Sequence, residues 1–523
     1  MKIQLQSQEV KLHIPPYTWK KFRQAMLNAR QDREEVIGFL FCQRHQLAKN
    51  KFRYTPVSWI VPTPDCYERQ STIDLVLKQS FHQYILDNYL GNTEENYSSV
   101  KKLDVVHIHT HFGNERPLFS ATDDLHEAKY AQFLANAYPH KPRLISGVFD
   151  ELLEQSEFRL WDRKGVYHTP IQFYNSWFAP VDEIEVSNRK ESEEDSNLMQ
   201  KELENSLRSL FTPKKPIFTT QNKTNNNSLA SEQTEEIFAR QRVFGNRVQQ
   251  QLGQIKVALI GCGGIGSVFA EQLARLGVKN WLLIDPDRLE TVNLNRMPGA
   301  TQQMVDQWWD KVNYVKWLIK RAYSIGSHVK TLPLFIEDKA VKAEIATADL
   351  IVVATDNQRS RQVAQELAIQ HTLPLVCLGT HIEVKPNNQP SLYARVTVPP
   401  LGGDWCLMCG NIINLQQAAL ETASTEMTEM AEKAGYLQGV DDPAVYWLNG
   451  ICASTGVGII HGILSGFVDA DSGLDWIYDF ANANWLKTNT EELHTEDCYF
   501  CASGVSPHND KEVTNYYQSY ILG

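Results

Sequence analysis

A glycine-rich segment between an apolar run and a helical pattern constrains this chain more than any other feature. Lys256–Ile260 (KVALI) has the length and apolarity of a buried strand, and Gly261–Gly266 (GCGGIG) follows directly. Ser267–Leu276 then carries apolar residues at helical spacing. Glycines at such a turn let a phosphate approach backbone amides at a helix N-terminus, where the helix dipole favours anions. The segment predicts a nucleotide site in an α/β domain, with phosphate-binding glycines Gly261, Gly263, Gly264 and Gly266.

Charged residues after the following strands narrow the kind of nucleotide chemistry. Trp281–Ile284 is a second apolar run, and it ends at Asp285, about twenty residues beyond the glycines, where an acidic residue binds a ribose hydroxyl. Further candidate nucleotide contacts are Asp287, Asn293, Arg296, Lys311 and, after the apolar run Leu350–Ala354, Asp356. A nicotinamide dehydrogenase, the alternative for a glycine loop alone, does not need such a set. An enzyme that splits ATP between its α- and β-phosphates does, because cations neutralise the triphosphate and an aspartate holds Mg²⁺.

From about Glu235 to the C-terminus, this set closely resembles the ThiF/MoeB family, the adenylating core of ubiquitin-activating enzymes. The resemblance implies a Rossmann-like fold in which Asp285 binds ribose and Asp356 binds Mg²⁺. It also implies that Asn293, Arg296 and Lys311 contact phosphates. Arg240 matches an arginine that the family lends across a dimer interface, so a homodimer is expected.

A histidine-rich segment near the N-terminus points to a second chemistry. In Asp104–Asp124 (DVVHIHTHFGNERPLFSATDD), His109 and His111 lie on one face if the segment is a strand. Ser120 to Asp123 begins a helix that can bring a carboxylate. Two imidazoles, one carboxylate and an open fourth position make a catalytic zinc site, in which bound water ionises near neutral pH. A histidine-rich strand without metal is the other interpretation.

This segment resembles the JAB/MPN (JAMM) metalloproteases, α+β domains that cut peptide or isopeptide bonds after ubiquitin-like C-termini. By that resemblance Glu35 is the general acid/base, and Ser120 helps to hold the tetrahedral oxyanion. The sequence departs from the family at Phe112, where a proline is usual. The loop to Ser120 is also one residue longer than the family pattern, so Asp124 is the alternative ligand to Asp123. An MPN fold that has lost its metal is another interpretation.

Four of the nine cysteines form two Cys-x-x-Cys pairs, Cys406 with Cys409 and Cys498 with Cys501. Such pairs favour metal over structural disulfides, and four thiolates together make a closed, tetrahedral zinc site. The ThiF/MoeB family carries this element in the same place. A redox disulfide is the alternative for either pair.

The loop in which ubiquitin-activating relatives usually carry an acceptor cysteine, here 411–442, contains none. Cys452 lies in the apolar helix predicted over Tyr446–Ile463, where a buried structural thiol is expected. The enzyme then either leaves the acyl-adenylate to an external nucleophile or transfers the acyl group to a loop hydroxyl. Ser424 is the first choice among these hydroxyls, and a polar loop without catalytic role is the remaining interpretation.

The length and composition of the chain limit its number of domains, its classes of binding partner and its location. A chain of 523 residues holds roughly three domains of about 150 residues. A net charge of −11 argues against nonspecific binding to nucleic acid or anionic membranes. No apolar run of about twenty residues is uninterrupted, and the first residues lack the pattern of a signal peptide, so we expect a cytoplasmic protein.

We therefore expect an α/β protein in three parts: a JAB/MPN metalloprotease domain over 1–180, a charged helix and flexible linker over 181–233, and a ThiF/MoeB-like adenylation domain over 234–523. The expected cofactors are ATP, Mg²⁺, one catalytic Zn²⁺ and one structural Zn²⁺.

The expected function is adenylation of the C-terminal carboxylate of a ubiquitin-like protein, with a fused peptidase that processes or removes the same protein. A ubiquitin-conjugating-type carrier enzyme is a further expected partner. Prokaryotic ubiquitin-like conjugation, including phage defence, is the setting that the combined resemblance implies. Activation of a sulfur carrier and a noncatalytic binding scaffold are the two rival functions.

Overall fold

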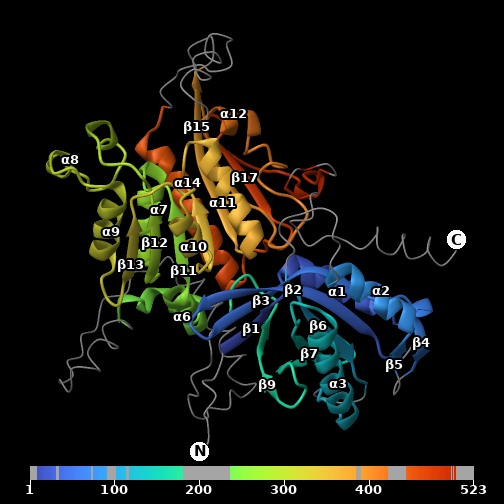
Figure 1. The fold of residues 1–523 in the computed structure, drawn as a ribbon. Helices are drawn as coiled ribbons and strands as arrows, with labels where there is room; N and C mark the ends of the chain where they lie inside the picture. Colours follow the sequence, from blue (N-terminus) through green and yellow to red (C-terminus); the bar gives the residue numbers. More distant parts are fainter. Residues whose placement is uncertain are drawn as a thin grey trace, which may run out of the picture.

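Two eight-stranded sheets, each with helices on both faces, make up the described part of the chain (Figure 1). The computed structural model describes residues 9–30, 34–71, 75–90, 102–112, 117–180, 236–384, 390–421, 443–495, 498 and 500–501. The predicted linker over 181–233 and the candidate Ser424 lie outside the described residues.

The N-terminal sheet has the strand order β10-β1-β3-β2-β6-β7-β8-β9. Its strands are β1 (Glu9–His13), β2 (Ile37–Ala48), β3 (Lys51–Ile60), β6 (Asp104–Thr110), β7 (Leu144–Phe149), β8 (Ser156–Trp161), β9 (His168–Pro170) and β10 (Gln172–Tyr174). Outside it, β4 (Tyr67–Gln70) pairs with β5 (Leu75–Leu77), after the short helix η1 (Pro64–Cys66). The central strand β2 runs antiparallel to both β3 and β6, so the histidine-bearing strand lies in the middle of the sheet.

Alternation along β2 divides this sheet between two cores. Leu40 packs in the core beneath α1 (Pro16–Asn28), whereas Phe39 and Phe41 pack on the opposite face. That opposite face is covered by α2 (Gln79–Leu90) and α3 (Ala121–Ala137). The helix α3 therefore lies over β6 and brings its first turn to the end of that strand.

The C-terminal sheet has the order β13-β12-β11-β14-β15-β16-β17-β18. Its strands are β11 (Lys256–Ile260), β12 (Asn280–Ile284), β13 (His328–Leu332), β14 (Leu350–Val353), β15 (Leu375–Val384), β16 (Pro390–Val398), β17 (Leu474–Asp479) and β18 (Asn484–Lys487). The first five strands in the order are parallel, and the last three pair antiparallel. The three apolar runs predicted as strands are thus confirmed, with ends that differ by at most one residue.

The helices of this half divide between the two faces of the sheet. One face carries α7 (Gly264–Arg275), α9 (Lys311–Ala322) and α14 (Tyr446–Ser465), and the other carries α10 (Lys339–Ile345) and α11 (Gln358–His371). Shorter elements are η2 (Ala239–Phe244), α6 (Asn246–Gln254), η3 (Thr291–Asn293), α8 (Gln302–Asp306), α12 (Leu415–Leu420) and η4 (Thr490–Glu492). By length and composition α14 could cross a membrane, but it packs against α7, β15 and β16 as a core helix.

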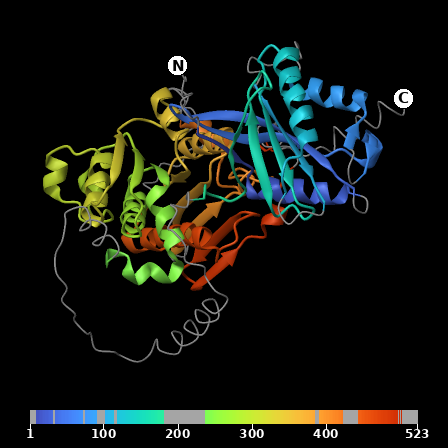
Figure 2. The same cartoon turned by 90° about the horizontal axis from the view of Figure 1, so that it is seen from below.

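The two halves lie next to one another in both views (Figures 1 and 2), and specific contacts join them. Arg53 of β3 donates to the carbonyl of His371 at the end of α11 at 3.2 Å, and Thr18 of α1 donates to the carbonyl of Gly402 at 3.2 Å. Trp177 and Phe178 pack in the core of the C-terminal sheet. The last residues of the range 1–180 therefore contact the second half.

We expect Gly38→Ala to destabilise the protein by about 1–3 kcal/mol, because overpacking forces side chains from their rotamers. A methyl group there would lie 2.5 Å from Cζ of Phe22 and 2.7 Å from Sδ of Met26. Thermal unfolding measures the effect. Gly458→Ala in α14 is the matched control, since its added methyl group meets no atom within 4 Å. An equal fall in Tm for both variants would contradict this account.

Candidate functional site

Three adjacent strand ends bring the predicted nucleotide residues together. β11 pairs in parallel with β12 on one side and with β14 on the other, and the chain order reverses there. The glycine loop follows β11, Asp285 follows β12, and Asp356 follows β14. In open α/β sheets, ligands bind outside the carboxyl ends of the strands at such a switch point.

At two positions of the glycine loop a side chain would collide with the backbone. Gly261 has a φ of +92°, and a Cβ there would lie 2.7 Å from the carbonyl oxygen of Ala354. A Cβ on Gly266 would lie 2.0 Å from the carbonyl oxygen of Gly261. At Gly263, by contrast, a Cβ would meet no protein atom within 4 Å. Because α7 begins at Gly264, the free amides of its first turn are available to an anion at this open position.

Asp285 is a buried carboxylate that shapes the loop. One oxygen accepts from the amide of Cys262 at 2.7 Å, and the other accepts from the amide of Asp287 at 2.9 Å. Burial raises the pKa of Asp285, and the nearby charge of Lys311 acts in the opposite direction. The carboxylate thus lies between the glycine loop and the predicted phosphate-binding lysine.

Lys311 begins α9, and its ammonium group lies among acidic side chains. Its Nζ contacts Oδ2 of Asp287 at 2.8 Å. Burial acts to lower the pKa of Lys311, but Asp285, Asp287 and Asp356 outweigh it and raise the pKa. The lysine is therefore held charged beside the glycine loop, as stabilisation of a triphosphate requires.

Arg296 lies against the glycine loop. Its Cγ and Cδ are each 3.3 Å from the position that a Cβ on Gly264 would take, and Nη1 donates to the carbonyl of Val292 at 2.7 Å. Asn293 is buried, and its Oδ1 accepts from the amide of Glu290 at 3.0 Å. Through this hydrogen bond Asn293 caps η3, in addition to making the phosphate contact that the sequence predicts for it.

Asn449 is a neighbour of the loop that sequence reasoning missed. It lies on α14, almost fully buried, with Nδ2 at 2.5 Å from the position of a Cβ on Gly264. Its Oδ1 accepts from the hydroxyl of Thr380 at 3.2 Å. The available signal was an amide near the start of a largely apolar helical run.

The turn after β14 has acidic and basic neighbours. Asp356 is exposed, and Glu421 accepts from the next two amides of α11, Gln358 at 3.0 Å and Arg359 at 2.8 Å. Arg361 donates to the carbonyl of Thr355 at 2.9 Å. The candidate Arg240 is exposed on η2 of the single chain.

Comparison with known proteins identifies the family of this half of the chain. The model of the ThiF family matches residues 238–385. The molybdopterin-synthase adenylyltransferase of Escherichia coli is 30% identical over 196 residues, which are 37% of this chain and 73% of that protein. The chain belongs to the ThiF family.

Two other relatives of this ThiF-family chain show how far the similarity extends. The sulfur carrier protein ThiS adenylyltransferase of Bacillus subtilis is 29% identical over 203 residues, 37% of this chain and 59% of that protein. The ubiquitin-like modifier-activating enzyme 5 of Culex quinquefasciatus is 41% identical over 61 residues, 12% of this chain and 15% of that protein. The chain thus spans less than two thirds of the length of either relative.

The histidine cluster lies outside the part that the ThiF family model matches. Nε2 of His109 and Nε2 of His111 lie 3.2 Å apart, and each is 3.4 Å from an oxygen of Asp123. Nδ1 of His111 is 3.1 Å from the carbonyl oxygen of Leu118, which can only accept, so Nδ1 carries the proton and Nε2 keeps its lone pair. The three predicted ligands therefore point their donor atoms at one place, where a metal ion fits.

A capping box at the start of helix α3 fixes the orientation of Asp123. The carboxylate of Asp123 accepts a hydrogen bond from the amide of Ser120 at 2.6 Å, and the amide of Asp123 donates to Oγ of Ser120 at 3.1 Å. Asp124, the alternative ligand, forms an ion pair with Arg159 instead. The predicted oxyanion residue Ser120 thus also serves as a helix cap.

Glu35 lies half-buried just before β2. Burial raises its pKa to about 7, with Asp123 adding to this and His109 acting against it. A carboxyl group that is half-protonated near neutral pH can both take up and give back a proton. The predicted acid/base therefore has a suitable pKa.

The two cysteine pairs meet at a single cluster, also outside the matched range of the ThiF family model. Sγ of Cys406 is 3.8 Å from that of Cys409 and 3.7 Å from that of Cys498, and the sulfurs of Cys409 and Cys501 are 3.9 Å apart. A zinc ion with Zn–S bonds of about 2.3 Å places its sulfurs about 3.8 Å apart, whereas disulfide sulfurs lie about 2.05 Å apart. The distances therefore fit a tetrahedral ion.

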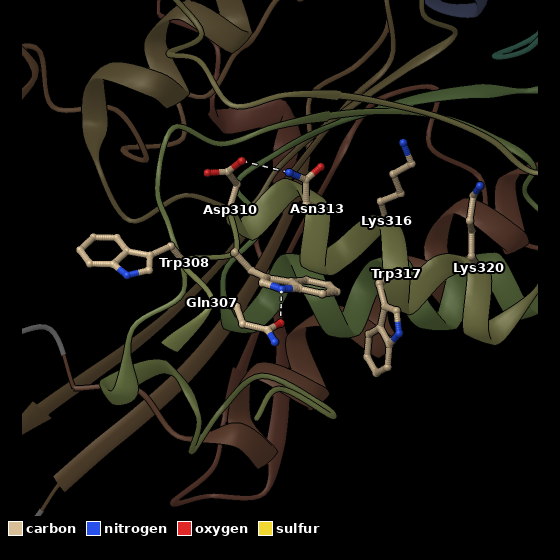
Figure 3. A pocket seen from close by; sticks show the side chains of 8 residues that line it. Gln307, Trp308, Asp310, Asn313, Lys316, Trp317 and Lys320 are labelled. Carbon is tan, nitrogen blue, oxygen red and sulfur yellow. Dashed lines mark hydrogen bonds between the residues drawn. The ribbon is translucent and has the colours of Figure 1, made fainter. Parts of the chain in front are cut away.

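A further hollow in the ThiF-family half lies away from these sites. It is lined from the outer side of α9 and the segment before it by Gln307, Trp308, Trp309, Asp310, Asn313, Lys316, Trp317 and Lys320 (Figure 3). None of these residues is among the predicted ligands.

For this ThiF-family chain we expect Gly266→Ala to lower Tm and Gly263→Ala to leave it unchanged. The first methyl group would collide with the backbone of Gly261, and the second enters open space that a nucleotide would occupy. ATP should raise the Tm of the unmodified chain and of neither variant. Differential scanning fluorimetry with and without Mg-ATP measures both effects. An unchanged ATP response in Gly263→Ala would contradict this position for the phosphates.

Proposed function

We propose that this protein uses Mg-ATP to adenylate the C-terminal carboxylate of a small ubiquitin-like protein. The observation that supports this most is the convergence of the glycine loop, Arg296 and Lys311 at the switch point of a ThiF-family sheet. The names of the relatives associate such domains with adenylyl transfer and modifier activation.

In the proposed reaction, an oxygen of the partner's terminal carboxylate attacks the α-phosphorus of ATP. A bond between the carboxylate oxygen and the α-phosphorus forms, and the bond from the α-phosphorus to the oxygen bridging to the β-phosphate breaks. Pyrophosphate leaves with that electron pair. Lys311 and Arg296 stabilise the developing negative charge, Asp285 binds the ribose, and Asp356 holds Mg²⁺.

The acyl-adenylate needs a nucleophile, and Cys452 is unsuited to that role. Its thiol is buried on α14, hydrogen-bonds to the carbonyls of Gly379 and Arg395, and has its pKa raised by burial to about 12. We therefore propose attack by an external nucleophile, such as a carrier enzyme. Transfer to Ser424 is the alternative.

A second function, hydrolysis after the same C-terminus, is favoured by the convergence of His109, His111 and Asp123. We assign residues 1–180 to a JAB/MPN domain with zinc at these ligands. Zinc in such a site supplies Lewis-acid activation of water and of the scissile carbonyl. Glu35 takes the proton from the attacking water and gives it to the leaving amine, and Ser120 donates to the oxyanion.

We assign a structural zinc to the cysteine cluster. Cys406 and Cys409 stand after β16, and Cys498 and Cys501 come from the far end of the described chain. Four thiolates close the coordination sphere, so this ion has no position for substrate. It holds together two segments that are distant in sequence.

The partner class is the least constrained part of the proposal. The Bacillus subtilis relative is named as the adenylyltransferase of a sulfur carrier protein, which favours a sulfur carrier as the second candidate partner. The proposed peptidase favours a ubiquitin-like modifier, because removal from targets gives that site a use. A homodimer, in which Arg240 acts in the partner's site, completes the proposal.

We expect ATP–pyrophosphate exchange that depends on a ubiquitin-like partner with a free C-terminus. Asp356→Ala and Lys311→Ala should each lower the exchange rate at least about 100-fold, because the first removes the proposed Mg²⁺ ligand and the second removes a cation that stabilises the phosphates. Asp306→Ala, an exposed acid on α8, is the matched control and should exchange normally. Undiminished exchange in Asp356→Ala would disprove the assigned magnesium position.

We expect Glu35→Gln to abolish cleavage of a peptide fused to the partner's C-terminus while zinc content and exchange stay unchanged. The amide cannot carry the proton, and Glu35 is not among the proposed ligands. Mass spectrometry of the fusion protein measures cleavage, and elemental analysis measures zinc. Cleavage at the normal rate in this variant would rule out the assigned acid/base.

A further inference from the structure

Behind the histidine cluster, a buried carboxylate of α3 approaches the histidines of β6. Glu127 is 3% exposed and His109 is 5% exposed. Glu127, His107 and His109 each have a potential ligand atom, and these three atoms lie within 4.8 Å of one another. This second group shares His109 with the proposed zinc site.

One oxygen of Glu127 receives every hydrogen bond that the carboxylate makes. Oε2 accepts from Nε of Arg159 at 2.8 Å, from Nη2 of Arg159 at 2.6 Å and from Nε1 of Trp161 at 2.9 Å. Within the described residues, Oε1 of Glu127 and the Nδ1 atoms of His107 and His109 are buried without a hydrogen-bond partner. Three such atoms on three neighbouring side chains are unusual, because a buried polar group without a partner costs about 1–3 kcal/mol.

The charges near these three atoms favour a hydrogen bond over a second metal ion. A second cation between the two histidines and Glu127 would face the guanidinium of Arg159, which already pairs with this carboxylate and lies over the ring of Phe119 at 3.7 Å. Two like charges that share one carboxylate in a buried place repel strongly. A proton on one imidazole nitrogen, in contrast, satisfies a donor and an acceptor at once.

We propose that Glu127 is a positioning residue for the zinc site. Its Oε1 accepts the hydrogen on Nδ1 of His109, directly or through one water molecule. His109 is thereby held in the tautomer whose Nε2 lone pair points toward His111 and Asp123. The inference rests on the proposed zinc site and adds a residue to it that the ligand pattern alone does not identify.

Glu127→Gln tests this proposal because the donors around residue 127 dictate how the amide turns. Arg159 and Trp161 only donate, so they take the amide oxygen, and the NH₂ group is left facing the histidines. This NH₂ group then favours the tautomer of His109 that has a lone pair on Nδ1 and a hydrogen on Nε2. In that tautomer Nε2 has no lone pair for the zinc ion. We expect the affinity of this site for zinc to fall by about 10- to 100-fold.

The measurement is zinc competition with a chromogenic chelator on the full chain, with total zinc by elemental analysis. Trp161→Phe is the matched control, since it removes a donor from Oε2 and leaves Oε1 untouched, and its zinc affinity should be normal. Glu127→Asp keeps the charge with a shorter reach, and should bind zinc more weakly than the unmodified chain. Glu127→Asp therefore still tests the proposal if Glu127→Gln does not fold.

The outcomes separate this inference from the proposal on which it rests. Normal zinc affinity in folded Glu127→Gln, or an equal loss in Trp161→Phe, would overturn the positioning role and leave the zinc site standing. One more zinc ion per chain than the two assigned sites hold would also overturn it, in favour of a metal at His107, His109 and Glu127. If His109→Ala loses no zinc, the zinc site itself is wrong, and the inference falls with it.

Discussion

Parallel pairing of β11 with two neighbours is the constraint on which the proposed nucleotide site depends. Because β12 and β14 flank β11 and all three point the same way, their carboxyl ends place three loops side by side. Residues that are almost a hundred positions apart, from Gly261 to Asp356, then border one space. The hydrogen bonds that Asp285 accepts from two loop amides hold this arrangement. Preorganised groups of this kind need no rearrangement when charge develops on a phosphate.

The sequence was informative where local chemistry determines position. The strand–glycine–helix pattern and the two acids at strand ends fixed the Rossmann-like half, and the His-x-His spacing with a helix start predicted three converging donor atoms. The paired cysteines likewise predicted their own cluster. In each case either the spacing of the functional residues within a short segment determines how they are placed, or the fold class determines how separate segments come together.

Neighbours contributed by distant elements could not be predicted in the same way. Asn449 reaches the glycine loop only because α14 packs beside α7, and Glu421 reaches the start of α11 from beyond β16. Glu127 in the sequence is one more acid on an exposed-looking helix, with no local signal of burial beneath Arg159 and Trp161. Such contacts follow from tertiary packing, which a pattern along one segment does not specify.

The contact between the halves has its own physical consequence. Arg53 is 4% exposed and donates to the last carbonyl of α11, the helix that begins beside Asp356. Asp349, before β14, lies close enough to Arg53 for the arginine's charge to act against the rise in pKa that burial causes in this carboxyl group. Separating the halves would take the charge of Arg53 away from Asp349 and would expose Trp177 and Phe178, which pack in the second core. Both costs oppose separation. One helix thus runs from the nucleotide loops to the N-terminal sheet, and this contact fixes where the two proposed chemistries stand relative to each other.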